Sequence, residues 1–330
     1  MSKRPTLTQY IDGITSGNIA MLGRAITLIE STLPEHQQLA EQIIAHCLPL
    51  SGESIRIGIT GVPGVGKSSF IEKFGLHVVG QLSKKVAVLA IDPTSSISGG
   101  SILGDKTRME QLAVHPRAFI RPSPAGNSLG GVARKTRESI YLCEAAGFEV
   151  ILVETVGVGQ SETAVHSMVD FFLLLMLSGA GDELQGIKRG IMEMADALFI
   201  TKADGANIDR AKLAATEYRR AMHLLPPHAS GWIPQTGICS ALTGEGMDRV
   251  WETIESYRLQ ATLQGYFSEK RKKQAVYWME ETIHGQIRQL FFSNAAVKAA
   301  YPGYLEALMD GRITSYKAAE ELLALYFSNK

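Results

Sequence analysis

The sequence predicts an α/β fold in which helices flank a mostly parallel sheet, with a helical extension before the sheet and a helical arm after it. Two observations carry this prediction. Between residues 55 and 240, short apolar or β-branched segments alternate with helical stretches, which is the pattern of βαβ units. Before residue 50 and after Gly265, only the helical spacing of apolar residues is found. We therefore expect three parts: the extension at residues 1–50, the sheet domain at 51–264 and the arm at 265–330.

The expected strands are short and mostly apolar, as the strands of a buried parallel sheet are. They lie at Ile55–Thr60, Val86–Ile91, Ala118–Arg121, Val150–Glu154, Phe171–Leu177, Ala197–Thr201 and Trp232–Ile238. Polar or glycine-rich residues directly follow several of these strands. Because ligands of such sheets bind at the carboxyl ends of the strands, we expect the chemistry at that edge.

The composition is that of a globular protein, with 330 residues of which 45% are hydrophobic. Lys+Arg and Asp+Glu both number 33, so the bulk charge provides no attraction for nucleic acid or an anionic membrane. The N-terminus lacks the apolar core of a signal peptide, and the longest apolar run, Phe171–Leu177, is too short to span a bilayer. Cys47, Cys143 and Cys239 are widely spaced, which favours reduced thiols over disulfides or a zinc site. These features predict a cytoplasmic protein.

The two ends of the chain carry helical patterns. The extension has one apolar face, formed by Ile19, Leu22, Ile26 and Ile29, and a second helical segment around Leu39–Cys47. We interpret it as a brace on the sheet domain.

The arm carries an apolar stripe at steps of three and four residues. Its members are Val276, Met279, Ile283, Ile287 and Leu290. Such a stripe must be buried against something, either this chain or the same helix of a second copy, and spacing leaves both open. We interpret the preceding charged run, residues 269–273, as a solvated helix face, with docking of a partner as the alternative.

Residues 61–68 read Gly-Val-Pro-Gly-Val-Gly-Lys-Ser, which fits the pattern GxxxxGK[ST] of a P-loop NTPase. The run follows the first expected strand and precedes a helix expected over Ser69–Leu82. Backbone N–H groups of such a loop surround phosphates, Lys67 reaches the terminal phosphates, and Ser68 gives an oxygen to Mg²⁺. The residues expected to contact the nucleotide here are Gly61, Val62, Gly64, Val65, Gly66, Lys67, Ser68 and Ser69.

Thr201-Lys202-Ala203-Asp204 follows an expected strand and fits the [NT]KxD element that selects guanine. The Asp204 carboxylate would accept two hydrogen bonds from guanine, while the stem of Lys202 lies along the base. Ser240, Ala241 and Leu242 follow the last strand, where backbone N–H groups would face the guanine carbonyl. The alternative for Asp204 is a helix cap. Because Thr201 replaces the commoner Asn, we expect weaker positioning of the P-loop.

Magnesium needs hard oxygen ligands, of which proteins usually supply only one or two. The candidates are Ser68, Asp92, Asp105 and Glu154. Asp92 precedes a proline, so a turn is its alternative role. Glu154 ends a strand, and Gly157, three residues later, would turn its N–H toward the γ-phosphate.

Hydrolysis needs an oriented water and positive charge at the γ-phosphate. Val158 stands where many GTPases carry a glutamine, so we expect slow intrinsic turnover that a loop or a partner completes. The expected catalytic residues are Lys67, Glu154, Asp105 and Lys188, and Arg108, Arg189, Asp182 and Glu183 are further candidates.

Long strings in the sequence resemble the MeaB/ArgK group of P-loop GTPases, of the SIMIBI class. They are residues 61–68, 92–96, 99–109 (GGSILGDKTRM), 154–162 (ETVGVGQSE), 179–188 (GAGDELQGIK) and 201–204. The resemblance covers almost the whole chain. It implies a homodimeric GTPase that acts as a chaperone of adenosylcobalamin-dependent methylmalonyl-CoA mutase, gates loading of its cobalamin and protects or rescues the mutase.

By the same resemblance, residues 92–105, 154–162 and 179–188 would be three switch segments, and the C-terminal helices would form the dimer arm. Two other functions stay open. A phosphotransferase linked to periplasmic amino-acid (LAO/AO) transport would place phosphate on a protein acceptor. A nucleotide-dependent scaffold would not hydrolyse GTP, and the intact Lys67, Ser68 and Glu154 argue against it.

Overall fold

The computed structural model describes residues 4–91, 109–122, 129–155, 161–179 and 189–328. The chain divides into two compact units, Met1–Gln274 and Ala275–Lys330. The N-terminal helices belong to the same unit as the sheet. The division into three functional parts stays a prediction.

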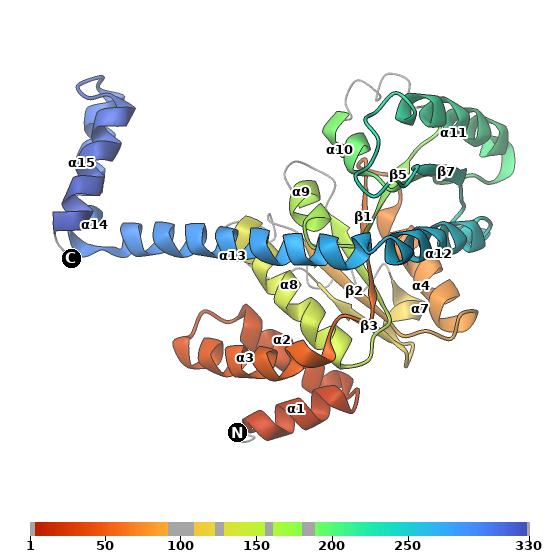
Figure 1. Ribbon diagram of the computed structural model, residues 1–330, viewed down its shortest axis with the longest axis horizontal. Coiled ribbons are helices and arrows are strands. Elements are labelled where there is room, and N and C mark those ends of the chain that lie inside the picture. Colours follow the sequence, from red (N-terminus) through yellow and green to blue (C-terminus); the bar gives the residue numbers. More distant parts are fainter. Residues whose placement is uncertain (1–3, 92–108, 123–128, 156–160, 180–188, 329–330) are drawn as a thin grey trace. The chain divides into compact units, whose positions relative to one another are not determined.

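The first unit is built on a parallel sheet with strand order β3-β2-β4-β1-β5-β6-β7 (Figure 1). The strands are β1 (Ile55–Gly61), β2 (Val86–Ile91), β3 (Ala118–Arg121), β4 (Val150–Thr155), β5 (Phe171–Met176), β6 (Ala197–Ile200) and β7 (Gln235–Ile238). Each neighbouring pair in this sheet runs parallel. The α/β prediction is confirmed, although β7 begins at Gln235 and not at Trp232, because Pro234 has no N–H to donate to a ladder.

Helices cover both faces of the sheet. Those between the strands are α4 (Lys67–Gly80), α7 (Glu110–Ala113), α8 (Leu129–Ala145), α9 (Ser161–His166), α10 (Arg189–Met194) and α11 (Ile208–Met222), with a short 3₁₀ turn, η2 (Gly205–Asn207), before α11. The helix α12 (Met247–Leu263) follows the last strand. On one face, Ile57 and Ile59 of β1 share a buried cluster with Phe70 and Phe74 of α4. On the opposite face, α9 packs so closely on β1 that a Cβ added to Gly58 would lie 2.8 Å from Val165 Cγ1.

The N-terminal extension forms three helices, α1 (Leu7–Thr15), α2 (Ile19–Glu30) and α3 (Pro34–Cys47), followed by the 3₁₀ turn η1 (Leu48–Leu50). Asn18 caps α2 by accepting hydrogen bonds from the N–H groups of Ala20 and Met21. Of the expected apolar face, Leu22, Ile26 and Ile29 are buried, whereas Ile19 is exposed. The helices α2 and α3 pack against α8, as a brace would.

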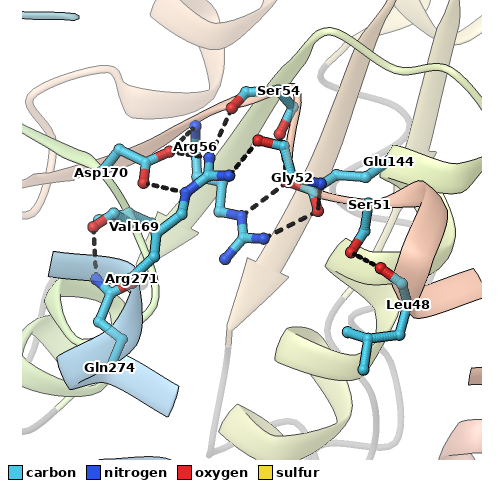
Figure 2. Close-up of polar contacts among 10 residues, drawn as sticks. All are labelled: Leu48, Ser51, Gly52, Ser54, Arg56, Glu144, Val169, Asp170, Arg271 and Gln274. Carbon is cyan, nitrogen blue, oxygen red and sulfur yellow. Dashed lines mark hydrogen bonds and ion pairs between the residues drawn. The ribbon is translucent and has the colours of Figure 1, made fainter. Parts of the chain in front are cut away.

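A buried ion pair lies at the amino edge of the sheet, where Glu144 of α8 meets Arg56 of β1 (Figure 2). The Glu144 carboxylate accepts hydrogen bonds from Arg56 Nε (2.8 Å) and Nη2 (2.9 Å), from Ser54 Oγ (2.6 Å) and from Gly52 N (2.9 Å). Burial acts to lower the pKa of the Arg56 guanidinium, but the hydrogen bonds and charge of Glu144 outweigh it, so that pKa is raised.

The charged run at 269–273 is only in part the solvated face that the sequence predicts. It lies on α13 (Tyr266–Ser293). Arg271 forms a bidentate ion pair with the buried Asp170, with Nη2 2.7 Å from Oδ2 (Figure 2). Lys270 donates to the backbone oxygen of Asp170 at 2.6 Å. Glu269 and Lys273 do pair with each other in solvent. The run is therefore partly docked on the rest of the first unit.

The second unit holds the rest of α13 with α14 (Ala295–Met309) and α15 (Ser315–Ser328). Tyr304 of α14 donates to Glu321 of α15 at 2.9 Å, and Ala318 and Leu322 are buried. The expected apolar stripe of α13 is between 46% and 59% exposed along its length. Within the described part of the chain, no helix is both long and apolar enough to cross a bilayer.

Candidate nucleotide-binding site

The loop between β1 and α4 has the backbone that a phosphate cradle requires. Gly64 and Gly66 have φ values of 77° and 91°, in the left-handed region that favours glycine. A Cβ on Gly61 would lie 2.4 Å from the backbone oxygen of Leu175 in β5, so only glycine fits there. Gly66 also serves as the N-cap of α4, which is why this helix begins at Lys67 and not at the expected Ser69. The first N–H groups of α4 have no carbonyl partner within the helix, as is typical of a helix N-terminus that binds an anion.

Lys67 stands at the start of α4, and its Nζ donates to the backbone oxygen of Gly61 at 2.9 Å. Burial lowers the pKa of the Lys67 ammonium, and the nearby charges of Glu154 and Glu162 oppose this shift. A partly desolvated ammonium at this position is well suited to pair with phosphate oxygens.

Ser68 and Glu154 meet across the loop. The Ser68 hydroxyl donates to Glu154 Oε1 at 3.3 Å, and Glu154 is 9% exposed at the carboxyl end of β4. A hydroxyl and a carboxylate are the hard oxygen donors that Mg²⁺ takes from proteins, the rest coming from phosphate and water. The donor set here therefore fits Mg²⁺.

The segment after β6 is hydrogen-bonded directly to the phosphate loop. The Thr201 hydroxyl donates to the backbone oxygen of Val65 at 2.7 Å, and Lys202 Nζ donates to that of Gly64 at 2.9 Å. Lys202 takes a left-handed backbone, with a φ of 55°. The threonine that replaces the commoner asparagine thus does hold the loop.

Asp204 faces the segment that follows β7. Its Oδ2 accepts from Ser240 Oγ at 2.5 Å, and the same Ser240 oxygen accepts from the N–H groups of Leu242 and Thr243 at 3.2 Å. Although Asp204 occupies the N-cap position of η2, its side chain makes no capping hydrogen bond. The structure thus brings together Lys202, Asp204 and the 240–242 segment, and the helix-cap alternative lacks its hydrogen bond.

Comparison with known proteins agrees with this arrangement. The sequence profile of one family, described as "Methylmalonyl Co-A mutase-associated GTPase MeaB", matches residues 22–296, well over half of the chain. The chain belongs to the MeaB family. GTPase ArgK of Escherichia coli K12 is 41% identical over 322 residues, covering 98% of this chain and 97% of the relative. The Mus musculus protein named "Methylmalonic aciduria type A homolog, mitochondrial" is 42% identical over 326 residues, covering 96% and 78%.

A solved structure of a LAO/AO transport system kinase matches this MeaB-family chain with a TM-score of 0.79 and 35% identity, covering 100% of both chains. Because its family and its relatives are GTPases, this protein is a GTPase, which binds GTP and hydrolyses it to GDP and phosphate.

Several predicted site residues of this MeaB-family GTPase lie outside the described residues. They are Asp92, Asp105, Arg108, Gly157, Val158, Asp182, Glu183 and Lys188. Arg189 is the first residue of α10. The structure places Lys67, Ser68 and Glu154 together, and their catalytic and metal-binding roles stay predictions.

The sequence analysis places Glu162 only within the expected switch segment 154–162 and assigns no role to its side chain, which lies in the first turn of α9. Glu162 is 3% exposed, and its charge acts on the pKa of Lys67. Among the residues described, its Oε2 has no hydrogen-bond partner. A buried carboxylate so placed is expected to gain a partner when the site fills, because leaving it unpaired costs free energy. The signal in the sequence was an acidic residue in the helix that follows the Glu154–Gly157 element.

We expect Lys67→Ala in this MeaB-family GTPase to lose GTP affinity by about 100-fold or more, because hydrogen bonds between charged groups disappear. Titration calorimetry with GTP measures this, and Lys84→Ala, which removes a partly exposed surface ion pair with Glu149, is the control. Unchanged affinity in Lys67→Ala would contradict the phosphate-binding role.

Proposed function

We propose that this MeaB-family GTPase is a chaperone of methylmalonyl-CoA mutase, which gates loading of the mutase's cobalamin cofactor and protects that enzyme. The observation that carries the proposal is a phosphate loop hydrogen-bonded to Thr201 and Lys202, the segment predicted to select guanine, in a chain whose family is described by its association with that mutase. Such a site couples occupancy by GTP to the state of the surrounding loops, and a client enzyme can respond to that state.

Magnesium is part of the proposal. Ser68 and Glu154 would hold the ion, with Asp92 and Asp105 as further oxygen donors. Bound Mg²⁺ would neutralise charge on the β- and γ-phosphates. Lys67 would bind the same phosphates, Lys188 would complete the positive charge, and Glu154 would also order the water of the metal.

We also propose that the protein acts as a homodimer in the cytoplasm. The support for the dimer is the exposed stripe of α13, which includes Met279, Ile283 and Ile287. An apolar helix face of this kind gains stability when it is buried against another apolar face, and a second copy supplies a matching one. The support for the compartment is that Cys47, Cys143 and Cys239 are all free and buried, as is usual under reducing conditions.

The deciding experiment is a pull-down with purified methylmalonyl-CoA mutase, made with GDP and with a non-hydrolysable GTP analogue. We expect recovery of the mutase to differ between the two nucleotides, and the difference to vanish in Lys67→Ala. Negligible recovery with both nucleotides would rule out the mutase as partner.

A second candidate is a kinase associated with amino-acid transport, which the name of the solved neighbour favours. Incubation with γ-labelled GTP and candidate transport proteins separates the two. The chaperone proposal expects the label in free phosphate, whereas the kinase expects it on a protein acceptor.

A further inference from the structure

Asp170 is the centre of a buried polar cluster at the amino edge of the sheet (Figure 2). It is 1% exposed and directly precedes β5. Its Oδ2 accepts from Arg56 N at 2.8 Å and from Arg271 Nη2 at 2.7 Å, while Oδ1 accepts from Arg271 Nε at 2.8 Å. One carboxylate therefore joins β1, β5 and the start of α13.

The start of α13 makes further bonds to the same place. Arg271 also donates to the backbone oxygens of Ser54, at 2.6 Å, and Gly52, and its guanidinium lies 4.6 Å from the ring of Phe267. Gln274 Nε2 donates to the backbone oxygen of Val169 at 2.8 Å. We call Asp170, Arg271 and Gln274, with the Val169 carbonyl, the α13 clamp.

The clamp holds the far end of the segment that leaves the nucleotide site. β4 ends at Thr155 beside the phosphate loop, and the parallel β5 begins at Phe171 at the opposite edge. The chain between them, which contains α9, must therefore cross the full height of the sheet. Close packing of Val165 and Val169 on Gly58 leaves little room for this segment to bend.

The two ends of α9 therefore face different parts of the molecule. The helix packs against β1 and β4, whose carboxyl ends lie beside the phosphate loop, and its first turn carries the buried Glu162. The turn after α9 carries Val169 and Asp170, which the clamp holds. A rigid element with one end at a ligand and the other in a polar cluster passes displacement between them.

We propose that Asp170 and Arg271 are positioning residues of the GTPase site, which couple the nucleotide-dependent position of α9 to the first turns of α13. The inference rests on the nucleotide-dependent function proposed above. By linkage the coupling is reciprocal, so loosening the clamp changes the relative affinities for GTP and GDP.

Two variants loosen the clamp while keeping its shape. Arg271→Lys keeps the charge but loses the two-pronged pairing with Asp170. Gln274→Met keeps the length of the side chain but cannot donate to the Val169 oxygen. Lys272→Ala is the matched control, because Lys272 lies on the same turn and is exposed. Circular dichroism checks that each full-length variant is folded.

The measurement is amide hydrogen exchange of residues 161–170 and 266–274, with GDP and with a non-hydrolysable GTP analogue. In the wild type and in Lys272→Ala, we expect both segments to exchange at nucleotide-dependent rates. In both clamp variants, we expect the difference in exchange between the two nucleotides to persist at 161–170. At 266–274, we expect this difference to fall below about half of its wild-type value. We expect the ratio of GTP to GDP affinity to change by about 5-fold or more in Arg271→Lys.

Two outcomes would overturn the inference, and only the second would also contradict the proposed function. Nucleotide-dependent exchange at 161–170 without any at 266–274 in the wild type would remove the coupling alone. Identical exchange of both segments with the two nucleotides would remove the coupling together with the nucleotide-dependent switching on which the proposed function rests.

Discussion

Asp204→Asn should reduce the preference for GTP over ATP by up to about 10⁴–10⁵-fold, which is the discrimination that a site built on hydrogen bonds to one base can reach. The Asp204 carboxylate accepts from Ser240 Oγ. We predict that it also accepts the two donors of guanine. An asparagine side chain keeps one acceptor and presents an N–H₂ group where guanine also presents donors. Competition binding of GTP against ATP measures the effect.

Xanthosine triphosphate sharpens this test, because xanthine has a carbonyl where guanine has its amino group. The amide that Asp204→Asn introduces could donate to that carbonyl, so the variant should prefer xanthosine triphosphate to GTP. Asp209→Asn is the control, since Asp209 is an exposed carboxylate at the start of α11, close to Asp204 along the chain. Full retention of the preference for GTP in Asp204→Asn would show that the base is read elsewhere.

Glu144→Ala should destabilise the protein by about 3–5 kcal/mol, as expected when one partner of a buried ion pair is removed. The side chains of Arg56 and Glu144 are 8% and 1% exposed, so the guanidinium would be left in a place that water hardly reaches. The hydroxyl of Ser54 and the N–H of Gly52 would lose their acceptor as well. Urea denaturation followed by circular dichroism measures the free energy of unfolding.

Two further variants serve as controls for the effect of Glu144→Ala on stability. Glu252→Ala removes an exposed pair with Arg249 and should cost no more than about 1 kcal/mol. Replacing the buried pair by apolar residues, in Arg56→Met with Glu144→Leu, should recover much of the loss, because neither charge is then stranded. A loss in Glu144→Ala no greater than in Glu252→Ala would mean that the buried pair contributes little.

The sheet and the phosphate loop were predictable because their signals are local. Alternating apolar segments define parallel strands, and the run from Gly61 to Ser68 contains both the glycines and the side chains that the loop needs. Parallel topology then brings the carboxyl ends of the strands to one edge. This is why Glu154 and Asp204, far apart in the chain, could be assigned to the same site.

The role of the charged run was not predictable from local sequence. Consecutive charged residues usually face water, and Arg271 is docked only because Asp170 lies buried 101 residues earlier in the chain. The bonds of Thr201 and Lys202 to the phosphate loop escaped prediction for a related reason. Their acceptors are backbone oxygens, which no sequence pattern marks.

Those two bonds carry a kinetic consequence. Thr201 and Lys202, in the segment predicted to bind the base, also hold the carbonyls of Val65 and Gly64. A purine that fits poorly should therefore strain the turn that is predicted to bind the triphosphate. A nucleotide with the wrong base should then be hydrolysed more slowly than GTP even at a saturating concentration. Discrimination between bases would therefore appear in the turnover rate as well as in the binding affinity.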